Sequence, residues 1–134
     1  MVELFPYIFS EDAKKQAEFY VNALDGEILV MKTFGELLRA NNHIHIRDKI
    51  MYLQFKAVGQ VFLMSDLPEG FISRGNGMAL SLRFLDEAKA QKAFDNLVQG
   101  GNVIIAFEKQ LWGSSSSGIV EDPFGVRWQI ETTC

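Results

Sequence analysis

The feature that most constrains the fold is an approximate internal repeat. When the chain is shifted by 75 positions, segment 11–19 lies over 86–94 with four identical residues, and Gly26 lies over Gly101. Phe9 also falls on Phe84. Amphipathic helices often look alike, but the matches before and after this helix favour a duplication over a chance likeness. One such unit cannot cover its own sheet, so two similar units are expected.

Apolar periodicity and turn residues predict a strand–helix–strand–strand–strand order in each half. Helices are predicted from Ser10–Asp12 to the residue before Gly26, and over 86–99. The segments 35–49, 66–77 and 113–118 are predicted to be loops, the last of them a mobile flap because it is rich in serine. Strands are predicted at 4–9, 27–34, 50–56, 60–65, 78–84 and 102–108, and in a closing hairpin over 118–130.

The closing hairpin has turn residues at Asp122–Gly125, with Asp first, Pro second and Gly fourth. In the strand that follows, side chains alternate between two faces. Trp128 is large and apolar and is expected to face the core. Arg127 and Gln129 must then lie on the opposite face.

Composition limits the possible functions. A chain of 134 residues with 48% hydrophobic residues is expected to form one domain with its own core. A net charge of −4 argues against general nucleic-acid binding. The single cysteine allows no disulfide within the chain, and neither a signal peptide nor a membrane span is evident, so a cytoplasmic location without membrane partners is expected.

Motifs along nearly the whole chain resemble one branch of a known superfamily. They are Pro6–Tyr7, Phe19–Tyr20, Phe34–Glu36, Met64–Asp66, Trp112–Gly113 and Asp122–Trp128. In this order they resemble the PhnB-like, 3-demethylubiquinone-9 3-methyltransferase-type branch of the vicinal oxygen chelate superfamily, which also includes glyoxalase I, bleomycin-resistance proteins and extradiol dioxygenases. The resemblance implies an α+β fold with two βαβββ modules, about 1–67 and about 77–134, whose cupped mixed sheets surround a cavity.

Metal-using members of that superfamily carry His or Glu ligands on the first and last strands of each module. The matching last-strand positions here are Leu63 and Gln129, and the third-strand position where a His is common in the PhnB-like pattern is Tyr52. On the opening strands, the residues expected on the face that carries such ligands are Leu4, Pro6 and Ile8 in one module and Ala79, Ser81 and Arg83 in the other. These are poor ligands for zinc, iron or manganese, so no catalytic metal or other cofactor is expected. His43 and His45 could form a two-histidine metal fragment, but a polar loop pair is the favoured interpretation.

Polar residues on the otherwise apolar strands indicate a ligand-binding face. The candidate ligand-binding residues are Phe34, Glu36, Tyr52, Gln54, Ser81, Arg83, Trp112, Arg127 and Gln129. Two buried arginines require an anionic partner, which is either an acidic or polar aromatic ligand or a neighbouring carboxylate such as Glu36, Glu121 or Glu131. Glu36 is also the weak candidate for a general base.

The favoured function is binding of a small molecule in the sheet cup without a catalytic metal. The alternative is an enzyme of the same superfamily, metal-dependent or using a carboxylate base. A homodimer is predicted, because open sheets leave strand edges that need to be covered.

Overall fold

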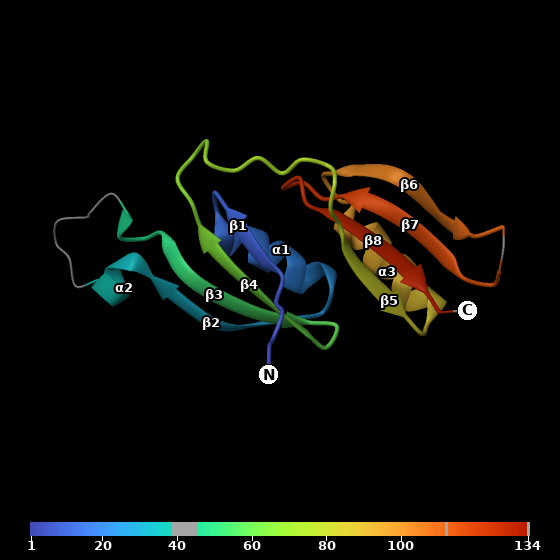
Figure 1. Ribbon diagram of the computed structural model, residues 1–134, viewed down its shortest axis with the longest axis horizontal. Coiled ribbons are helices and arrows are strands. Elements are labelled where there is room, and N and C mark those ends of the chain that lie inside the picture. The colour runs from blue at the N-terminus through green and yellow to red at the C-terminus, as the bar shows by residue number, and fades with distance from the viewer. Residues whose placement is uncertain (39–45, 112, 134) are drawn as a thin grey trace. The chain divides into compact units, whose positions relative to one another are not determined.

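The computed structural model describes residues 1–38, 46–111 and 113–133. It divides into two compact units, Met1–Ser73 and Arg74–Cys134, each with one four-stranded mixed sheet and one long helix (Figure 1). The predicted α+β class and the βαβββ order of both modules are confirmed.

In the first unit, sheet A has the strand order β1-β4-β3-β2, and α1 covers one face. β1 pairs parallel with β4, and the other two pairings are antiparallel. The elements are β1 (Tyr7–Ser10), α1 (Ala13–Ala23), β2 (Glu27–Thr33), β3 (Ile50–Ala57) and β4 (Gln60–Asp66). Among the described residues no further strand pairs with β1 or β2, so these two are the edge strands of sheet A.

In the second unit, sheet B repeats this arrangement with the order β5-β8-β7-β6 and α3 on one face. β5 pairs parallel with β8, as β1 does with β4. The elements are β5 (Leu80–Phe84), α3 (Glu87–Leu97), β6 (Asn102–Lys109), β7 (Ser116–Glu121) and β8 (Arg127–Thr132). The two halves of the predicted repeat therefore share the same strand order and the same parallel pairing of their first and last strands. We call the face of each sheet that is turned away from its long helix the open face.

The core of the first unit is an aromatic stack between α1 and sheet A. Phe55 and Phe62 lie opposite each other on β3 and β4, with ring centroids 4.8 Å apart and nearly parallel planes. Tyr20 of α1 stacks on Phe55 at 5.7 Å and is fully buried. Its hydroxyl accepts a hydrogen bond of 2.7 Å from the buried side-chain amide of Gln16. The Tyr20 hydroxyl and the Gln16 amide thus satisfy each other in the core.

The core of the second unit is centred on Trp128, which is fully buried beneath α3 as the sequence predicted. Its indole Nε1–H donates to Oδ2 of Asp122 at 2.9 Å. Oδ1 of the same carboxylate accepts from the backbone N–H groups of Phe124 and Val126, at 2.8 and 3.0 Å. The turn between β7 and β8 is thus held by one buried carboxylate that also anchors the largest core side chain.

The two long helices start with equivalent aspartate caps. The spacing between these caps differs by one residue from the offset of 75 at which the sequence repeat was found. Oδ1 of Asp12 accepts from the N–H of Lys15, and Oδ1 of Asp86 accepts from the N–H of Lys89. These caps are 74 residues apart, not 75. The offset of 75 holds only after the helices, where Gly26 and Gly101 both pack against backbone. The second helix is followed by one extra residue before its glycine.

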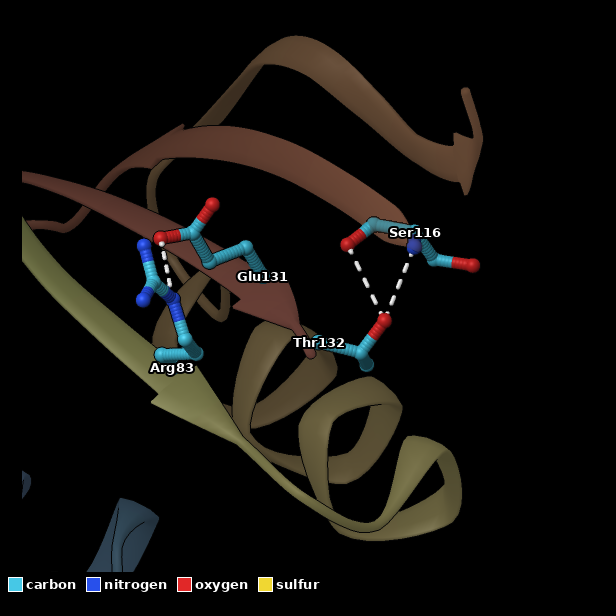
Figure 2. A network of polar contacts seen from close by, with 4 residues as sticks. All are labelled: Arg83, Ser116, Glu131 and Thr132. Atoms are coloured by element: carbon cyan, nitrogen blue, oxygen red, sulfur yellow. Dashed lines mark hydrogen bonds and ion pairs between the residues drawn. The ribbon is translucent and has the colours of Figure 1, made fainter. Parts of the chain in front are cut away.

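Two segments predicted as loops contain regular structure. The segment 35–49, predicted to be a loop, begins within a short helix, α2 (Phe34–Leu38), whose first residue was predicted to end the preceding strand. The serine run does not form a mobile flap over its whole length, because β7 begins at Ser116. Ser116 is 2% exposed, and its hydroxyl donates a hydrogen bond to the carboxylate of Glu87. Its backbone N–H donates to Thr132 Oγ1 at 2.8 Å (Figure 2).

The helices of the described segments are short. Both α1 and α3 have 11 residues. Over these segments we find no helix with the length and apolar character of a membrane span.

Candidate functional site

Sheet B brings four of the predicted ligand-binding residues onto its open face. Ser81 of β5 lies opposite Gln129 of β8, and Arg83 lies opposite Glu131. Arg127 lies one alternate position before Gln129 on the same strand. The predicted alternation of β8 is confirmed, because Trp128 and Ile130 are fully buried while Arg127, Gln129 and Glu131 are half-buried.

Both arginines on this face are paired with glutamates of the same sheet. Arg83 Nε lies 3.2 Å from Oε1 of Glu131, and Figure 2 shows the two side chains together on neighbouring strands. Arg127 Nη2 lies 3.4 Å from Oε2 of Glu121. Of the two interpretations that the sequence left open, ion pairing with neighbouring carboxylates is thus observed for both arginines. Glu36 is not the partner of either pair.

The two ion pairs differ in how far they satisfy the guanidinium group. The side chain of Arg83 is 67% exposed, so water completes its hydrogen bonding. The side chain of Arg127 is only 23% exposed, and its Nε is buried with no hydrogen-bond partner among the described residues. A guanidinium has five N–H donors, and one ion pair of 3.4 Å is at the long end for a hydrogen bond. Arg127 is therefore less completely hydrogen-bonded than Arg83.

Sheet A places Tyr52 and Gln54 on its open face, as the alternation along β3 predicted. The opening strand differs from the prediction. Ile8 is 6% exposed and lies opposite the buried Met64, so it faces α1. The open face of β1 carries Tyr7 and Phe9, which sequence reasoning missed.

The cause of this error is the offset chosen for the repeat. An offset of 75 places Ile8 over Arg83, whereas the aspartate caps give 74 and place Phe9 over Arg83 and Tyr7 over Ser81. Because side chains of a strand alternate, an offset that is wrong by one residue exchanges the two faces. Aligning the two capping aspartates in the sequence would have found both aromatic residues.

Glu36 has a local structural role that the sequence analysis did not assign. Its backbone N–H donates to Thr33 Oγ1 at 3.2 Å, and its carboxylate accepts from the Thr33 N–H at 3.4 Å. This reciprocal pair is a capping box at the start of α2. Phe34, the next predicted site residue, is half-buried in the first turn of α2, and its N–H donates to the carbonyl of Lys49. Glu36 and Phe34 belong to the first unit, whereas the paired arginines belong to the second. That either residue contacts a ligand stays a prediction.

The described residues at the positions where metal-using members of the superfamily carry ligands are of types that bind divalent metals poorly. The positions at which the resemblance would place ligands include Leu63 and Gln129, on the open faces of β4 and β8, together with Ser81 and the cationic Arg83. Across residues 1–38, 46–111 and 113–133, no group of three or more His, Cys, Asp or Glu side chains is placed to hold a metal. His43, His45 and Trp112, for which metal or ligand contacts were considered, lie outside the described residues.

Comparison with known proteins gives matches over almost the entire chain. The family model described as 3-demethylubiquinone-9 3-methyltransferase matches residues 4–131. Protein YjdN of Escherichia coli is 28% identical over 138 residues, a match that covers 95% of this chain and 92% of YjdN.

Solved structures share the fold. Protein PA1353 from Pseudomonas aeruginosa superposes with a TM-score of 0.82 at 24% identity, covering 98% of both chains. The PhnB protein from Bacillus cereus superposes with a TM-score of 0.79 at 20% identity, covering 98% of this chain and all of the other. The fosfomycin resistance protein FosX from Listeria monocytogenes shares the fold at 9% identity and a TM-score of 0.69, covering 96% of this chain and 92% of its own. These matches agree with the resemblance inferred from the motifs.

Proposed function

Because the chain belongs to the 3-demethylubiquinone-9 3-methyltransferase family, within the glyoxalase and bleomycin-resistance superfamily, we propose that it binds a small acidic or polar aromatic molecule. The binding residues that we propose on sheet B are Ser81, Arg83, Arg127 and Gln129. The acid group of the ligand contacts Arg127, and Ser81 and Gln129 supply further hydrogen bonds.

The observation that carries this proposal is the incomplete pairing of Arg127. Its side chain is about three-quarters buried, yet it has one long ion pair and a buried Nε without a partner among the described residues. Burying a cation without full hydrogen bonding costs free energy, and an anionic ligand at the accessible part of the guanidinium would offset part of that cost. Arg83 differs, because its exposed side chain is already solvated.

Methyl transfer, which the family description names, has no support in the strand–helix junctions of either unit. A methyl-donor nucleotide is usually held where a Gly-rich turn opens a helix. Here the start of α1 receives the carboxylates of Asp12 and Asp66, and the start of α3 receives that of Asp86. These side chains already fill the positions at which a helix binds an anion.

The test is a thermal-shift screen of aromatic carboxylates and sulfonates, followed by titration of each hit against an Arg127→Ala variant. We expect this change to weaken binding by about 1.5–3 kcal/mol, the range for a hydrogen bond to a charged group. It should change the free energy of unfolding by less than about 1 kcal/mol, since the ion pair that it removes is partly exposed.

Lys92→Ala is the matched control, because it removes one positive charge from the exposed side of α3 in the same unit. An equal loss of affinity in both variants would mean that only net charge matters, and the proposed contact would be wrong. No stabilisation by any screened molecule would count against binding altogether. Stoichiometric zinc, iron or manganese in protein purified without a His tag would favour the metal-dependent enzyme instead.

A further inference from the structure

The connector between β4 and β5 contains an asparagine followed by a glycine, Asn76–Gly77. Both residues are exposed and lie outside any helix or strand (Figure 1). Among the described residues, neither the side chain of Asn76 nor the backbone N–H of Gly77 has a hydrogen-bond partner. A Cβ added at Gly77 would meet nothing within 4 Å, so no neighbouring atom restrains this peptide unit.

An asparagine side chain next to such an unrestrained glycine is chemically reactive. The backbone nitrogen of Gly77 attacks Cγ of Asn76 and closes a succinimide ring, while the Gly77 proton and the side-chain NH₂ group leave together as ammonia. Water then opens the ring. Cleavage of the bond to Cγ gives aspartate, and cleavage of the bond to the α carbonyl gives isoaspartate, whose main chain runs through Cβ. Glycine favours ring closure because it has no Cβ that restricts the backbone.

The other asparagines that the structure describes lack this combination of features. Asn22 and Asn96 lie within α1 and α3, where the backbone is held in helical geometry. Asn102 is exposed, but it is paired within sheet B and is followed by the β-branched Val103. Exposure alone therefore does not select a reactive site, whereas exposure next to an unrestrained glycine does.

The pair Asp25–Gly26 provides an internal comparison, because an aspartate before glycine forms the same ring with loss of water. The N–H of Gly26 donates to the carbonyl of Val21 at 2.8 Å. A Cβ at Gly26 would collide with the carbonyl oxygen of Lys56, so the glycine is packed against backbone. Ring closure at Asp25 thus requires this region to unfold. The fold protects one of the two sites and leaves the other accessible.

From these observations we propose that Asn76 is a site of spontaneous deamidation in the folded protein, which accumulates isoaspartate and aspartate at this position with age. The reaction adds one negative charge to a chain whose net charge is −4. The modified peptide lies between two fixed points, since Arg74 Nε donates to the carbonyl of Phe124 at 3.1 Å and β5 begins at Leu80. Because the peptide is exposed and unpaired, we expect the fold to tolerate the change. The proposal does not depend on any role of Arg127.

The experiment incubates the full folded chain at body temperature and mildly alkaline pH, which favours the deprotonated amide nitrogen that attacks. Peptide mapping by mass spectrometry follows the conversion of amide into acid, and electron-transfer fragmentation distinguishes isoaspartate from aspartate. We expect both products at Asn76, while Asn102 and Asp25 stay unchanged over the same time. In guanidinium chloride, the rate at Asn76 should be nearly the same, and isoaspartate should now also form at Asp25.

Substitution of the glycine tests the chemistry directly. Gly77→Ala should slow conversion of Asn76 about tenfold or more, because the added Cβ restricts the backbone. Since this Cβ meets no atom within 4 Å, the slower reaction would not reflect a disturbed fold. Gly113→Ala is the matched control, because its Cβ also meets nothing within 4 Å and it should leave the rate at Asn76 unchanged. Asn76→Asp carries the charge of the product and should unfold at the same urea concentration as the wild type.

The proposal would be overturned if Asn76 stayed intact in the folded chain while the unfolded chain was converted, because the fold would then protect this site. It would also be wrong if Gly77→Ala reacted as fast as the wild type, since ring closure through the Gly77 nitrogen would not limit the reaction. Isoaspartate that formed at Asp25 of the folded chain as fast as at Asn76 would show that the local structure does not determine the site.

Discussion

The buried contact between Asp122 and Trp128 allows a quantitative test of how the last hairpin is stabilised. In an Asp122→Ala variant, the indole N–H of Trp128 loses its acceptor while the side chain stays fully buried. An unsatisfied buried donor costs about 1–3 kcal/mol. The N–H groups of Phe124 and Val126 belong to half-buried residues, so water partly replaces the carboxylate and their loss adds roughly 1 kcal/mol. We therefore expect the free energy of unfolding to fall by about 2–4 kcal/mol.

A double-mutant cycle with Trp128→Phe isolates the indole contact, because phenylalanine has no N–H to satisfy. The double variant should be more stable than the sum of the two single changes predicts, by about 1.5–3 kcal/mol. Unfolding in urea is followed by far-ultraviolet circular dichroism, so that removing a tryptophan does not alter the probe.

Asp86→Ala is the control for this cycle. Asp86 also accepts a backbone N–H in the second unit, but it is an exposed helix cap, and its loss should cost about 1 kcal/mol. Combined with Trp128→Phe, it should be additive. A coupling below about 0.5 kcal/mol between Asp122 and Trp128 would show that the indole hydrogen bond does not stabilise the hairpin, and the reasoning would fail.

Two further predictions concern packing and assembly. Gly101→Ala would place a Cβ 2.0 Å from the carbonyl oxygen of Glu121, so we expect a loss of about 2–4 kcal/mol in urea unfolding, whereas Gly77→Ala meets nothing within 4 Å and should leave stability nearly unchanged. Equal stability of the two variants would contradict the close packing at Gly101. We also propose that the chain is a homodimer, because β2 and β6 present free strand edges in the described structure. Light scattering at micromolar concentration checks this, and a monomer would refute it.

The face of β8 could be predicted from sequence because one residue decides it. Trp128 is too large and apolar to leave in water, and alternation then places Arg127 and Gln129 on the other face. The turn at Asp122–Gly125 fixes where the strand starts. Size, alternation and turn chemistry agree here, so the prediction was correct.

The face of β1 could not be obtained in this way. Tyr7, Ile8 and Phe9 are all bulky and apolar, so hydrophobicity does not say which of them faces the helix. The choice rested on the repeat offset, and the extra residue after α3 made the offset differ before and after the helix. The spacing of the two capping aspartates gives the right offset, and the contacts of Ile8 with buried partners across sheet A confirm it.

The short helix α2 and the start of β7 were missed for different reasons. The sequence from Thr33 to Glu36 fits a capping box, but this segment was predicted to be the end of a strand and the beginning of a loop. Ser116 is polar and lies in a serine run, which by composition indicates a flexible segment. Its burial depends on Thr132 and Glu87, which are distant in sequence, so local composition could not predict it.

The parallel pairings β1–β4 and β5–β8 also determine the order in which each sheet can form during synthesis. Within each unit the first strand made has a single partner, and that partner is the last strand made. β5 therefore leaves the ribosome before any strand exists with which it can pair, and α3, β6 and β7 follow it. A hairpin of β7 and β8 can form locally, whereas the addition of β5 must close a loop that spans nearly the whole unit. β1 and β5 are thus the last strands to join their sheets, and their backbone amides are expected to be the first to exchange with solvent when either sheet opens.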